Sequence, residues 1–141
     1  MSMIRLRRFL PVLPVMLVLG CGDSSQPLVP VTGTVSYRGT PLQNGTIVFT
    51  PDVRKGSTGA MAMGEIKSDG SYSLRTGKSF GAAPGHYRIT VAAVLGSPPS
   101  TGQPYNYQPS LLPEKYRDPE LSGLVFEVKA GLAQAVDLKL D

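Results

Sequence analysis

The stretch VTGTVSYRGTPLQNGTIVFTP, residues 31–51, decides the fold expected for this chain. Residues 31–37 alternate apolar and polar side chains, as a strand with one buried face does. Asn44-Gly45 tolerates the positive φ of a tight reversal, and residues 46–50 alternate again before Pro51, which cannot donate to a sheet ladder. The pattern predicts an antiparallel pair of strands joined by a turn, with an apolar face that later strands must cover.

The rest of the chain repeats short alternating runs separated by turn residues. Asp69-Gly70 predicts a hairpin turn, and the spaced carboxylates of a calcium loop do not surround it. Sixteen glycines and thirteen prolines favour short strands, and no convincing helix is expected. The predicted fold is all-β, a seven-stranded antiparallel β-sandwich of the transthyretin-like or immunoglobulin-like kind. Its strands are expected at residues 31–37, 46–50, 63–67, 71–76, 86–94, 124–128 and 135–140.

Composition and charge are those of one globular domain with attachments. The 141 residues are 41% hydrophobic and 17% charged, which is too apolar for a disordered chain. The net charge of +4 includes Arg5, Arg7 and Arg8, and without them eleven basic residues face ten acidic ones. No basic run remains, so nucleic acid is not an expected partner.

The first twenty residues have the organisation of an export signal. Basic residues 5–8 precede the apolar segment 9–19, which is too short to span a bilayer as a helix. The segment ends in Val18-Leu19-Gly20-Cys21, which resembles the bacterial lipobox. The resemblance implies cleavage between Gly20 and Cys21 and acylation of the Cys21 thiol and of its new amino group.

Cys21 is the only cysteine, so no disulfide within the chain explains it. The alternative is a plain secretory signal with an incidental cysteine. Gly22 follows, where an aspartate would signal retention in the inner membrane of some bacteria, so the outer membrane is favoured. The expected organisation is a signal peptide over residues 1–20, the lipidated cysteine and a flexible tether over 21–28, and the β-sandwich domain over 29–141.

Residues 95–122 form the longest irregular stretch, and loops of this length are usually functional or mobile. Tyrosine and arginine are over-represented at interface hot spots, which marks the stretch as a candidate binding loop. The alternative is that Tyr116 and Arg117 only anchor the loop to the domain, together with Leu111 and Leu112. The candidate binding residues are Tyr105, Tyr107, Tyr116 and Arg117.

His86, the only histidine, lies at the start of the most regular strand pattern, directly after Pro84-Gly85. A catalytic histidine needs an acid and a nucleophile within reach, which this sequence does not place. We therefore expect His86 to be exposed or at an edge, and we predict no catalytic residue, metal site or cofactor.

Several motifs in order resemble the carboxypeptidase regulatory-like, or transthyretin-like, domain of small bacterial envelope lipoproteins. The resemblance covers nearly all of residues 29–141 and implies a β-sandwich that acts as a structural or binding module. The fold also hosts 5-hydroxyisourate hydrolase, whose C-terminal tetrapeptide resembles Tyr37-Arg38-Gly39-Thr40; here these residues lie in the first predicted hairpin, and that enzyme uses more than one histidine. The motifs are VTGTV (31–35), GTPL (39–42), GTIVF (45–49), SDGSY (68–72), PGHYRITV (84–91), PEKYRDP (113–119) and SGL (122–124).

The sequence therefore predicts a non-enzymatic protein, held by a lipid anchor at Cys21 in the cell envelope, whose domain lies in the periplasm or at the cell surface. Its sandwich would be structural or would bind a protein or glycan. Two alternatives stay open. A small-substrate hydrolase would bring His86, an acid and a serine or arginine together in a pocket, and an accessory subunit of a transport system would carry its ligand in a deep apolar cavity.

Overall fold

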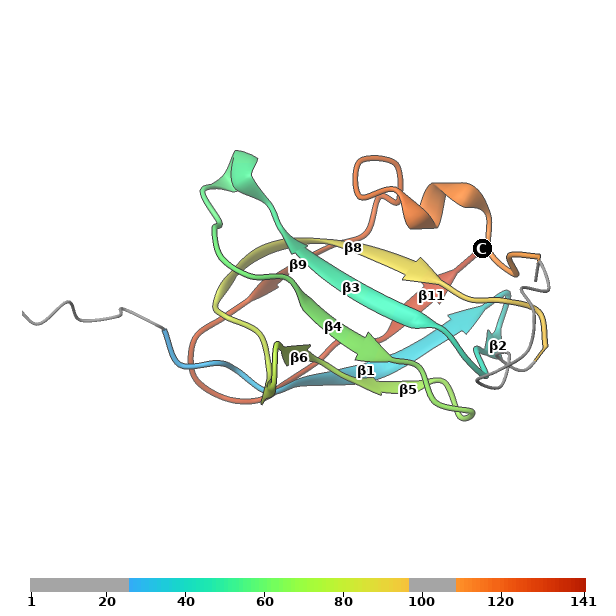
Figure 1. The fold of residues 1–141 in the computed structure, drawn as a ribbon, viewed down its shortest axis with the longest axis horizontal. Helices are drawn as coiled ribbons and strands as arrows, with labels where there is room; N and C mark the ends of the chain where they lie inside the picture. The colour runs from blue at the N-terminus through green and yellow to red at the C-terminus, as the bar shows by residue number, and fades with distance from the viewer. Residues whose placement is uncertain (1–25, 97–108) are drawn as a thin grey trace, which may run out of the picture.

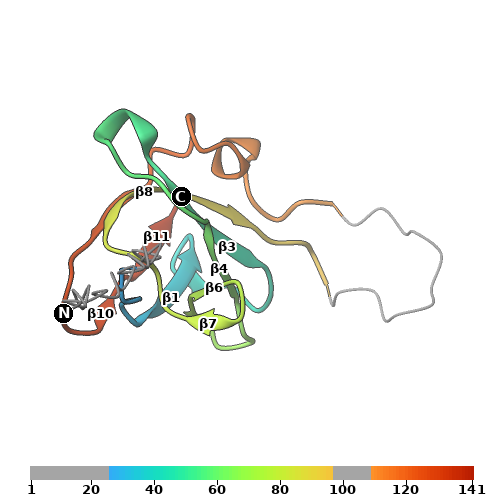
Figure 2. The ribbon, with the colours of Figure 1, turned by 60° about the vertical axis from the view of Figure 1, so that its left-hand side comes forward.

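The computed structural model describes residues 26–96 and 109–141, which form two facing β-sheets (Figures 1 and 2). The expected all-β character is confirmed, and the helical segments of this part are two short 3₁₀ turns, η1 (Val53–Lys55) and η2 (Glu114–Arg117). One sheet contains β1 (Val31–Tyr37), β2 (Thr40–Pro41), β5 (Ser71–Ser73), β10 (Gln134–Ala135) and β11 (Leu138–Leu140). The other has the order β7 (Ser79–Phe80), β6 (Arg75–Thr76), β4 (Ala62–Glu65), β3 (Thr46–Pro51), β8 (Gly85–Ala92) and β9 (Val125–Val128).

The predicted pairing of residues 31–37 with 46–50 is wrong, because β1 and β3 belong to different sheets. The tight reversal lies earlier, at Arg38 and Gly39, which both have positive φ and return the chain as β2 beside β1. Leu42 then donates its N–H to the carbonyl of Val35 at 3.0 Å and is buried between the sheets. The chain therefore crosses the core at Leu42 and starts β3 on the opposite side.

The sheet around β1 is mixed, so the prediction of a wholly antiparallel sandwich is also wrong. β10 and β11 both run parallel to β1, with Val31 opposite Gln134 and Val35 opposite Leu138. The predicted strand 135–140 is interrupted at Val136, whose N–H donates to Thr32 O at 2.8 Å. The parallel direction arises because the chain returns from β9 in the other sheet instead of making a hairpin with β1.

The predicted strand 71–76 is likewise divided between the sheets. The turn at Asp69-Gly70 forms as expected, with a Gly70 φ of 83° and a hydrogen bond from Gly70 N–H to Lys67 O of 2.8 Å. β5 after this turn pairs with β1, whereas β4 before it pairs with β3. Leu74, which is fully buried, marks the crossing from β5 to β6. The described residues therefore form eleven short strands instead of seven.

The core lies between the two sheets and is continuous. Phe49 of β3 stands at its centre, with its ring centroid 5.8 Å from that of Tyr87 and 6.4 Å from that of Phe126. Aromatic pairs at such distances add to the stabilisation that burial supplies. Within the described residues, no helix is long and apolar enough to cross a membrane. Other fully buried core side chains are Val31, Val35, Leu42, Ile47, Leu74, Ile89, Val91 and Val128.

Candidate functional sites

The candidate binding residues of the long loop divide into two pairs. Tyr105 and Tyr107 lie outside the described residues, as do Gly20 and Cys21. Tyr116 is 3% exposed; its hydroxyl lies 2.9 Å from Asp141 Oδ1 and accepts the Asp141 N–H at 3.1 Å. Its ring therefore offers no surface to a partner and anchors η2 to the C-terminal residue, which supports the alternative reading of Tyr116.

Arg117 is half exposed on the outer side of η2, where its guanidinium lies 3.3 Å from the Glu114 carboxylate. An exposed pair three residues apart contributes little to stability. Leu112 is buried and Leu111 packs against the core, so the second half of the loop lies back on the sandwich as expected. Of the four predicted residues, the structure thus leaves Arg117 accessible, buries Tyr116 and does not describe the other two.

His86 lies on β8 and is half exposed. Its Nε2 is 4.0 Å from Glu127 Oε1, because the register of β8 and β9 places these two residues opposite each other. The Ser57 hydroxyl accepts the backbone N–H of His86 at 2.7 Å, so this serine contacts the main chain of His86. A cleft of about 310 Å³ borders this pair, lined by Asp52, Lys55, Tyr87, Val125 and Phe126 as well.

A chain of ion pairs lies beside this cleft and joins three segments. The Asp52 carboxylate, 4% exposed, accepts the Arg54 N–H at 3.1 Å as the cap of η1 and lies 3.1 Å from Arg88 Nε. Arg88 Nη1 lies 3.2 Å from Glu120, and Arg54 lies 2.9 Å from the same Glu120 oxygen. The Asp52 carboxylate therefore accepts one backbone donor, the Arg54 N–H, and pairs with one side chain, that of Arg88. These two contacts hold η1 and β8 together.

Asp52 and Ser57, which also lie near His86, are engaged in structural contacts. Asp52 is held by Arg88, and Ser57 by the main chain. Among residues 26–96 and 109–141, no three histidine, cysteine, aspartate or glutamate side chains gather as metal ligands would. The cleft places His86 beside an acid, Glu127, as the hydrolase alternative requires, whereas the Ser57 hydroxyl contacts the main chain of His86 and Arg88 pairs with Asp52 and Glu120.

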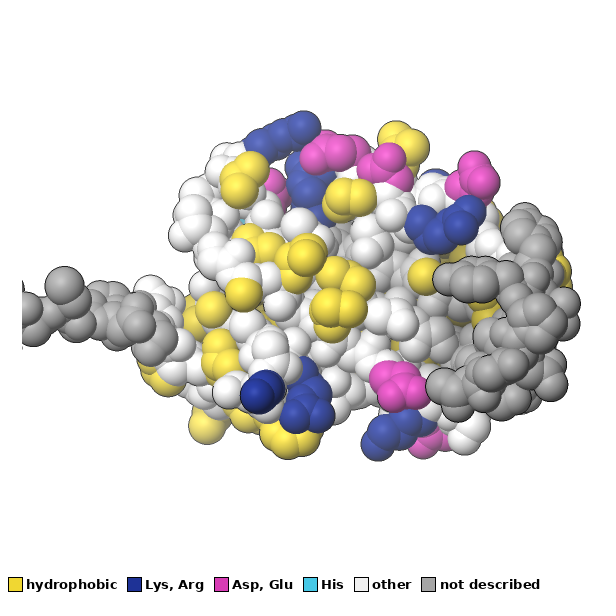
Figure 3. Space-filling view, viewed as in Figure 1, with side chains coloured by type: hydrophobic (Ala, Val, Ile, Leu, Met, Phe, Trp, Pro, Cys, Tyr) yellow, Lys and Arg dark blue, Asp and Glu magenta, His cyan; other side chains and the backbone are white. Residues whose placement is uncertain are grey.

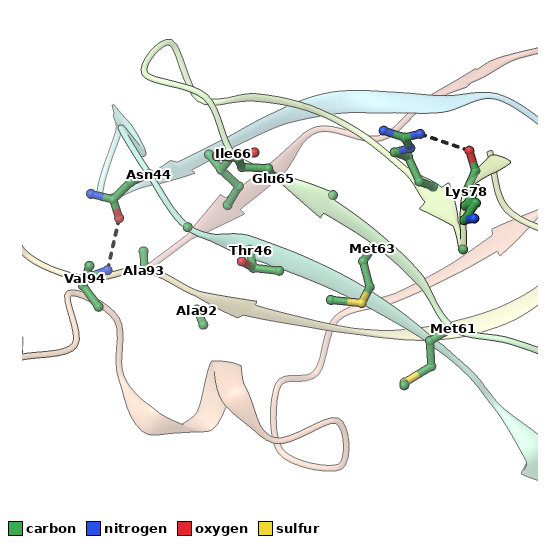
Figure 4. Close-up of a pocket in the computed structure, with 14 residues that line it drawn as sticks. Asn44, Thr46, Met61, Met63, Glu65, Ile66, Lys78, Ala92, Ala93 and Val94 are labelled. Atoms are coloured by element: carbon green, nitrogen blue, oxygen red, sulfur yellow. Dashed lines mark hydrogen bonds between the residues drawn. The ribbon is translucent and has the colours of Figure 1, made fainter. Parts of the chain in front are cut away.

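An open groove of about 910 Å³ lies on the outer face of the larger sheet (Figure 4). Met61 and Met63 lie along it, about half exposed, together with Thr46 and Ala92 from β3 and β8. Figure 3 shows hydrophobic side chains gathered over the middle of this face. Methionine side chains are flexible and polarizable, so the apolar floor of this groove can adapt its shape.

Polar groups surround the groove at its ends. At one end the Asn44 side chain accepts the Val94 N–H at 3.2 Å and donates to Gly96 O at 2.7 Å, which fixes this rim. At the other, Arg75 donates to Lys78 O at 3.0 Å and stacks over the Phe80 ring at 4.5 Å. The groove therefore has an apolar floor and rigid, partly basic borders.

No family model, curated protein or solved structure matches this chain. The resemblance to the carboxypeptidase regulatory-like domain thus stays a prediction that the motifs carry.

The sequence did not reveal the groove or the ion pairs. Met61 and Met63 are two residues apart, on either side of Ala62, and residues at this spacing share one face of a strand. This spacing was the available signal for an exposed apolar face. Strands β4 to β7 and the start of β8 separate Asp52 from Arg88 in sequence, and Glu120 lies a further thirty-two residues along the chain. Such pairings depend on sheet register, which local patterns do not contain.

Proposed function

We propose that this chain is a non-enzymatic, lipid-anchored envelope protein whose β-sandwich is a binding module for a protein partner. The observation that carries the proposal is the lipobox-like Val18-Leu19-Gly20-Cys21, followed within eight residues by the first buried residue of the sandwich, Val29. An acylated Cys21 would hold the domain beside the membrane. The facing side would be the periplasm or the cell surface, and the outer membrane is favoured.

The open groove over Met61 and Met63 supports the binding part of the proposal. Exposed apolar side chains that form one contiguous patch mark interaction sites, whereas isolated exposed apolar residues are common on protein surfaces. Sugar rings pack their C–H faces on aromatic rings, and the residues that line this groove include none. The neighbouring Phe80 ring is covered by Arg75 on one face. A protein segment with apolar side chains fits the groove better than a glycan does.

The first experiment tests the anchor. In a bacterial host, the wild-type chain should partition into the detergent phase of a membrane extract, and the Cys21→Ser variant should accumulate uncleaved or leave that phase. A Cys21→Ser variant that is still processed and membrane-bound would contradict the anchor.

The second experiment tests the groove. Cross-linking on intact membranes, read by mass spectrometry, should recover an envelope partner with the wild-type chain and lose it with Met63→Glu. Val125→Glu is the matched control, because Val125 is 63% exposed on the same sheet and lies outside the groove. Equal recovery with all three proteins would contradict a partner in the groove.

A further inference from the structure

We propose that the end of the sandwich at which the tether enters is a second contact surface, which rests on a bilayer containing anionic lipid headgroups. The surface consists of three exposed apolar tips, Val53, Phe80 and Leu132, interspersed with three lysines, Lys55, Lys78 and Lys129. The proposal deepens the proposed function, because it depends on the anchor at Cys21 to bring this end to the membrane.

The covalent chain limits how far this end can lie from the anchor. Seven peptide units separate Cys21 from Leu28, and a fully extended chain spans at most about 3.5 Å per residue, or about 25 Å in all. The Val29 N–H donates to Ala82 O at 2.8 Å, which fixes the entry point of the chain on the sandwich. Whatever lies at this entry point therefore lies within about 25 Å of an acylated Cys21.

The topology places the three turns that carry these side chains at the same end. The pairing of Val29 with Ala82 brings the β6–β7 turn, with Lys78 and Phe80, to the entry point. The pairing of Val31 with Gln134 brings the turn that joins β9 to β10, with Lys129 and Leu132, beside it.

The third turn is η1, which carries Val53 and Lys55. It follows β3 directly, after Asp52. The Asp52 N–H donates to His86 O at 2.8 Å, which places η1 next to the start of β8. Gly85, the first residue of β8, pairs with Val128, the last residue of β9, so η1 and the β9–β10 turn share this end. In Figure 1 the chain enters at the left, with η1 above the entry and the β9–β10 turn below it. Figure 2 brings this end forward, and β10 and β7 both lie near it.

The composition of this end suits a lipid surface. Val53 in η1 is 74% exposed, Phe80 at the end of β7 is 66% exposed and Leu132 in the β9–β10 turn is 88% exposed, which are high values for large apolar side chains. Lys55, Lys78 and Lys129 are exposed, and Arg54 adds a further cation whose charge Glu120 balances. Figure 3 shows hydrophobic and basic side chains side by side at the end where the chain enters. Apolar tips reach the headgroup boundary, and lysines beside them are attracted to anionic lipids.

One turn at the opposite end, Lys67–Ser71, differs in character. The Lys67–Ser71 turn lies there, because Gly70 packs against Val35 O near the end of β1. Its exposed charges alternate in sign, with Lys67 and Asp69 close together, and none of the exposed large apolar side chains belongs to it. It provides a matched control position.

The test uses the full chain, purified with its anchor and reconstituted into vesicles of phosphatidylcholine with or without phosphatidylglycerol. Since Cys21 is the only cysteine and its thiol would be acylated, a single new thiol can be labelled. Leu132→Cys and, as control, Lys67→Cys each carry an environment-sensitive fluorophore. We expect the label at position 132 to shift its emission to the blue and to be protected from a water-soluble quencher in the anionic vesicles, and the label at 67 to stay exposed.

The charge dependence is tested with Lys55→Glu, Lys78→Glu and Lys129→Glu together. Each lysine near an anionic surface is worth roughly a fivefold change in the equilibrium, so the triple variant should leave the label at 132 accessible to the quencher. High salt should have the same effect on the wild-type charge set. Equal exposure of the two labels in anionic vesicles, or protection that the triple variant keeps, would overturn the proposal.

Failure of the anchor is distinguished by a separate readout. If the chain without a new thiol also reacts with the fluorophore, Cys21 is free and the proposed anchor is wrong. The membrane surface is then tested by sedimentation of the same chain with the two kinds of vesicle. Binding to the anionic vesicles that the triple variant loses would support the surface without the anchor, and binding unaffected by the triple variant would overturn it.

Discussion

Replacing Arg88 with methionine tests the ion pair that holds η1 to β8. The substitution keeps most of the side-chain length and removes the guanidinium, which lies 3.1 Å from the Asp52 carboxylate. Asp52 is 4% exposed and would remain buried with one donor, the Arg54 N–H. Breaking a buried pair by removing one partner costs about 3–5 kcal/mol; the Arg88 side chain is 21% exposed, which admits water and reduces the expected cost to about 2–3 kcal/mol.

The partner substitution completes a double-mutant cycle. Asp52→Asn keeps an oxygen that can accept the Arg54 N–H and removes the charge, so we expect a cost of about 1–2 kcal/mol. The double variant should cost little more than Arg88→Met alone, which gives a coupling energy of about 1–2 kcal/mol. Glu120→Gln is the control, since Glu120 is half exposed and its pairing with Arg88 should contribute less than about 1 kcal/mol.

The assay is urea unfolding followed by circular dichroism at constant temperature, with the slope of the transition required to stay constant across the variants. Salt separates the two pairs, because screening weakens the exposed contact with Glu120 and leaves the buried contact with Asp52 largely intact. A coupling energy near zero, or a cost for Glu120→Gln as large as that for Arg88→Met, would refute the reasoning.

Three further substitutions test the fold. The Tyr72 hydroxyl lies 2.7 Å from Val136 O, and burial first and the Asp137 charge second raise its pKa above the usual value. Tyr72→Phe should therefore cost about 1–2 kcal/mol in the free energy of unfolding. As the pH rises above about 10, the stability of the wild type should fall in unfolding experiments and the stability of the variant should not show this loss. Gly33→Ala places a Cβ 1.9 Å from Val136 O and should cost about 3 kcal/mol in thermal or urea unfolding. Gly39→Ala is the control, since position 39 lies in open space at positive φ and the substitution should cost about 1 kcal/mol. Equal costs would contradict the close approach of the Val136 carbonyl to Gly33. The Ser71 hydroxyl first and the Ser71 N–H second lower the pKa of Asp69. The ionised Asp69 therefore stabilises the turn above the unfolded pKa, and this stabilisation is lost as the pH falls below it. An NMR titration should show a higher Asp69 pKa in Ser71→Ala, and an unchanged value would contradict the assignment.

The strand content of this chain could be predicted from sequence because the alternation of buried and exposed side chains is local. In the predicted strand 71–76, Tyr72 and Leu74 alternate with polar residues, and both are buried. The same holds for Tyr87, Ile89 and Val91, which lie on the buried face of β8. Sheet membership could not be predicted, because Leu42 and Leu74 carry the chain across the core between strands that look continuous in sequence.

The direction of the last strand shows the same limit. In the predicted strand 135–140, Val136 and Leu140 fall on the apolar side of the alternation, and both are buried, yet β10 and β11 run parallel to β1. The constraint that fixes this arrangement is the glycine at position 33, which leaves room for the carbonyl of Val136. A glycine in a strand indicates a close approach without naming the segment that approaches.

The candidate sites could be predicted in part. The sequence offered both a binding role and an anchoring role for Tyr116, and its contacts with Asp141, twenty-five residues away, support the anchoring role. The same residue types serve at interfaces and in loop anchors, so composition alone could not decide between them. The exposed tips Val53, Phe80 and Leu132 were not singled out, because only the topology brings them to one end.

The covalent state of Cys21 tests the central proposal most directly. The chain would be purified from the membranes of a bacterial host, digested, and its N-terminal peptide analysed by mass spectrometry. We expect a peptide that begins at Cys21 and carries a diacylglycerol thioether, with an acyl group on the new amino terminus. A peptide that begins elsewhere, or that begins at Cys21 with a free thiol, would contradict the anchor and with it the proposed place of this protein in the envelope.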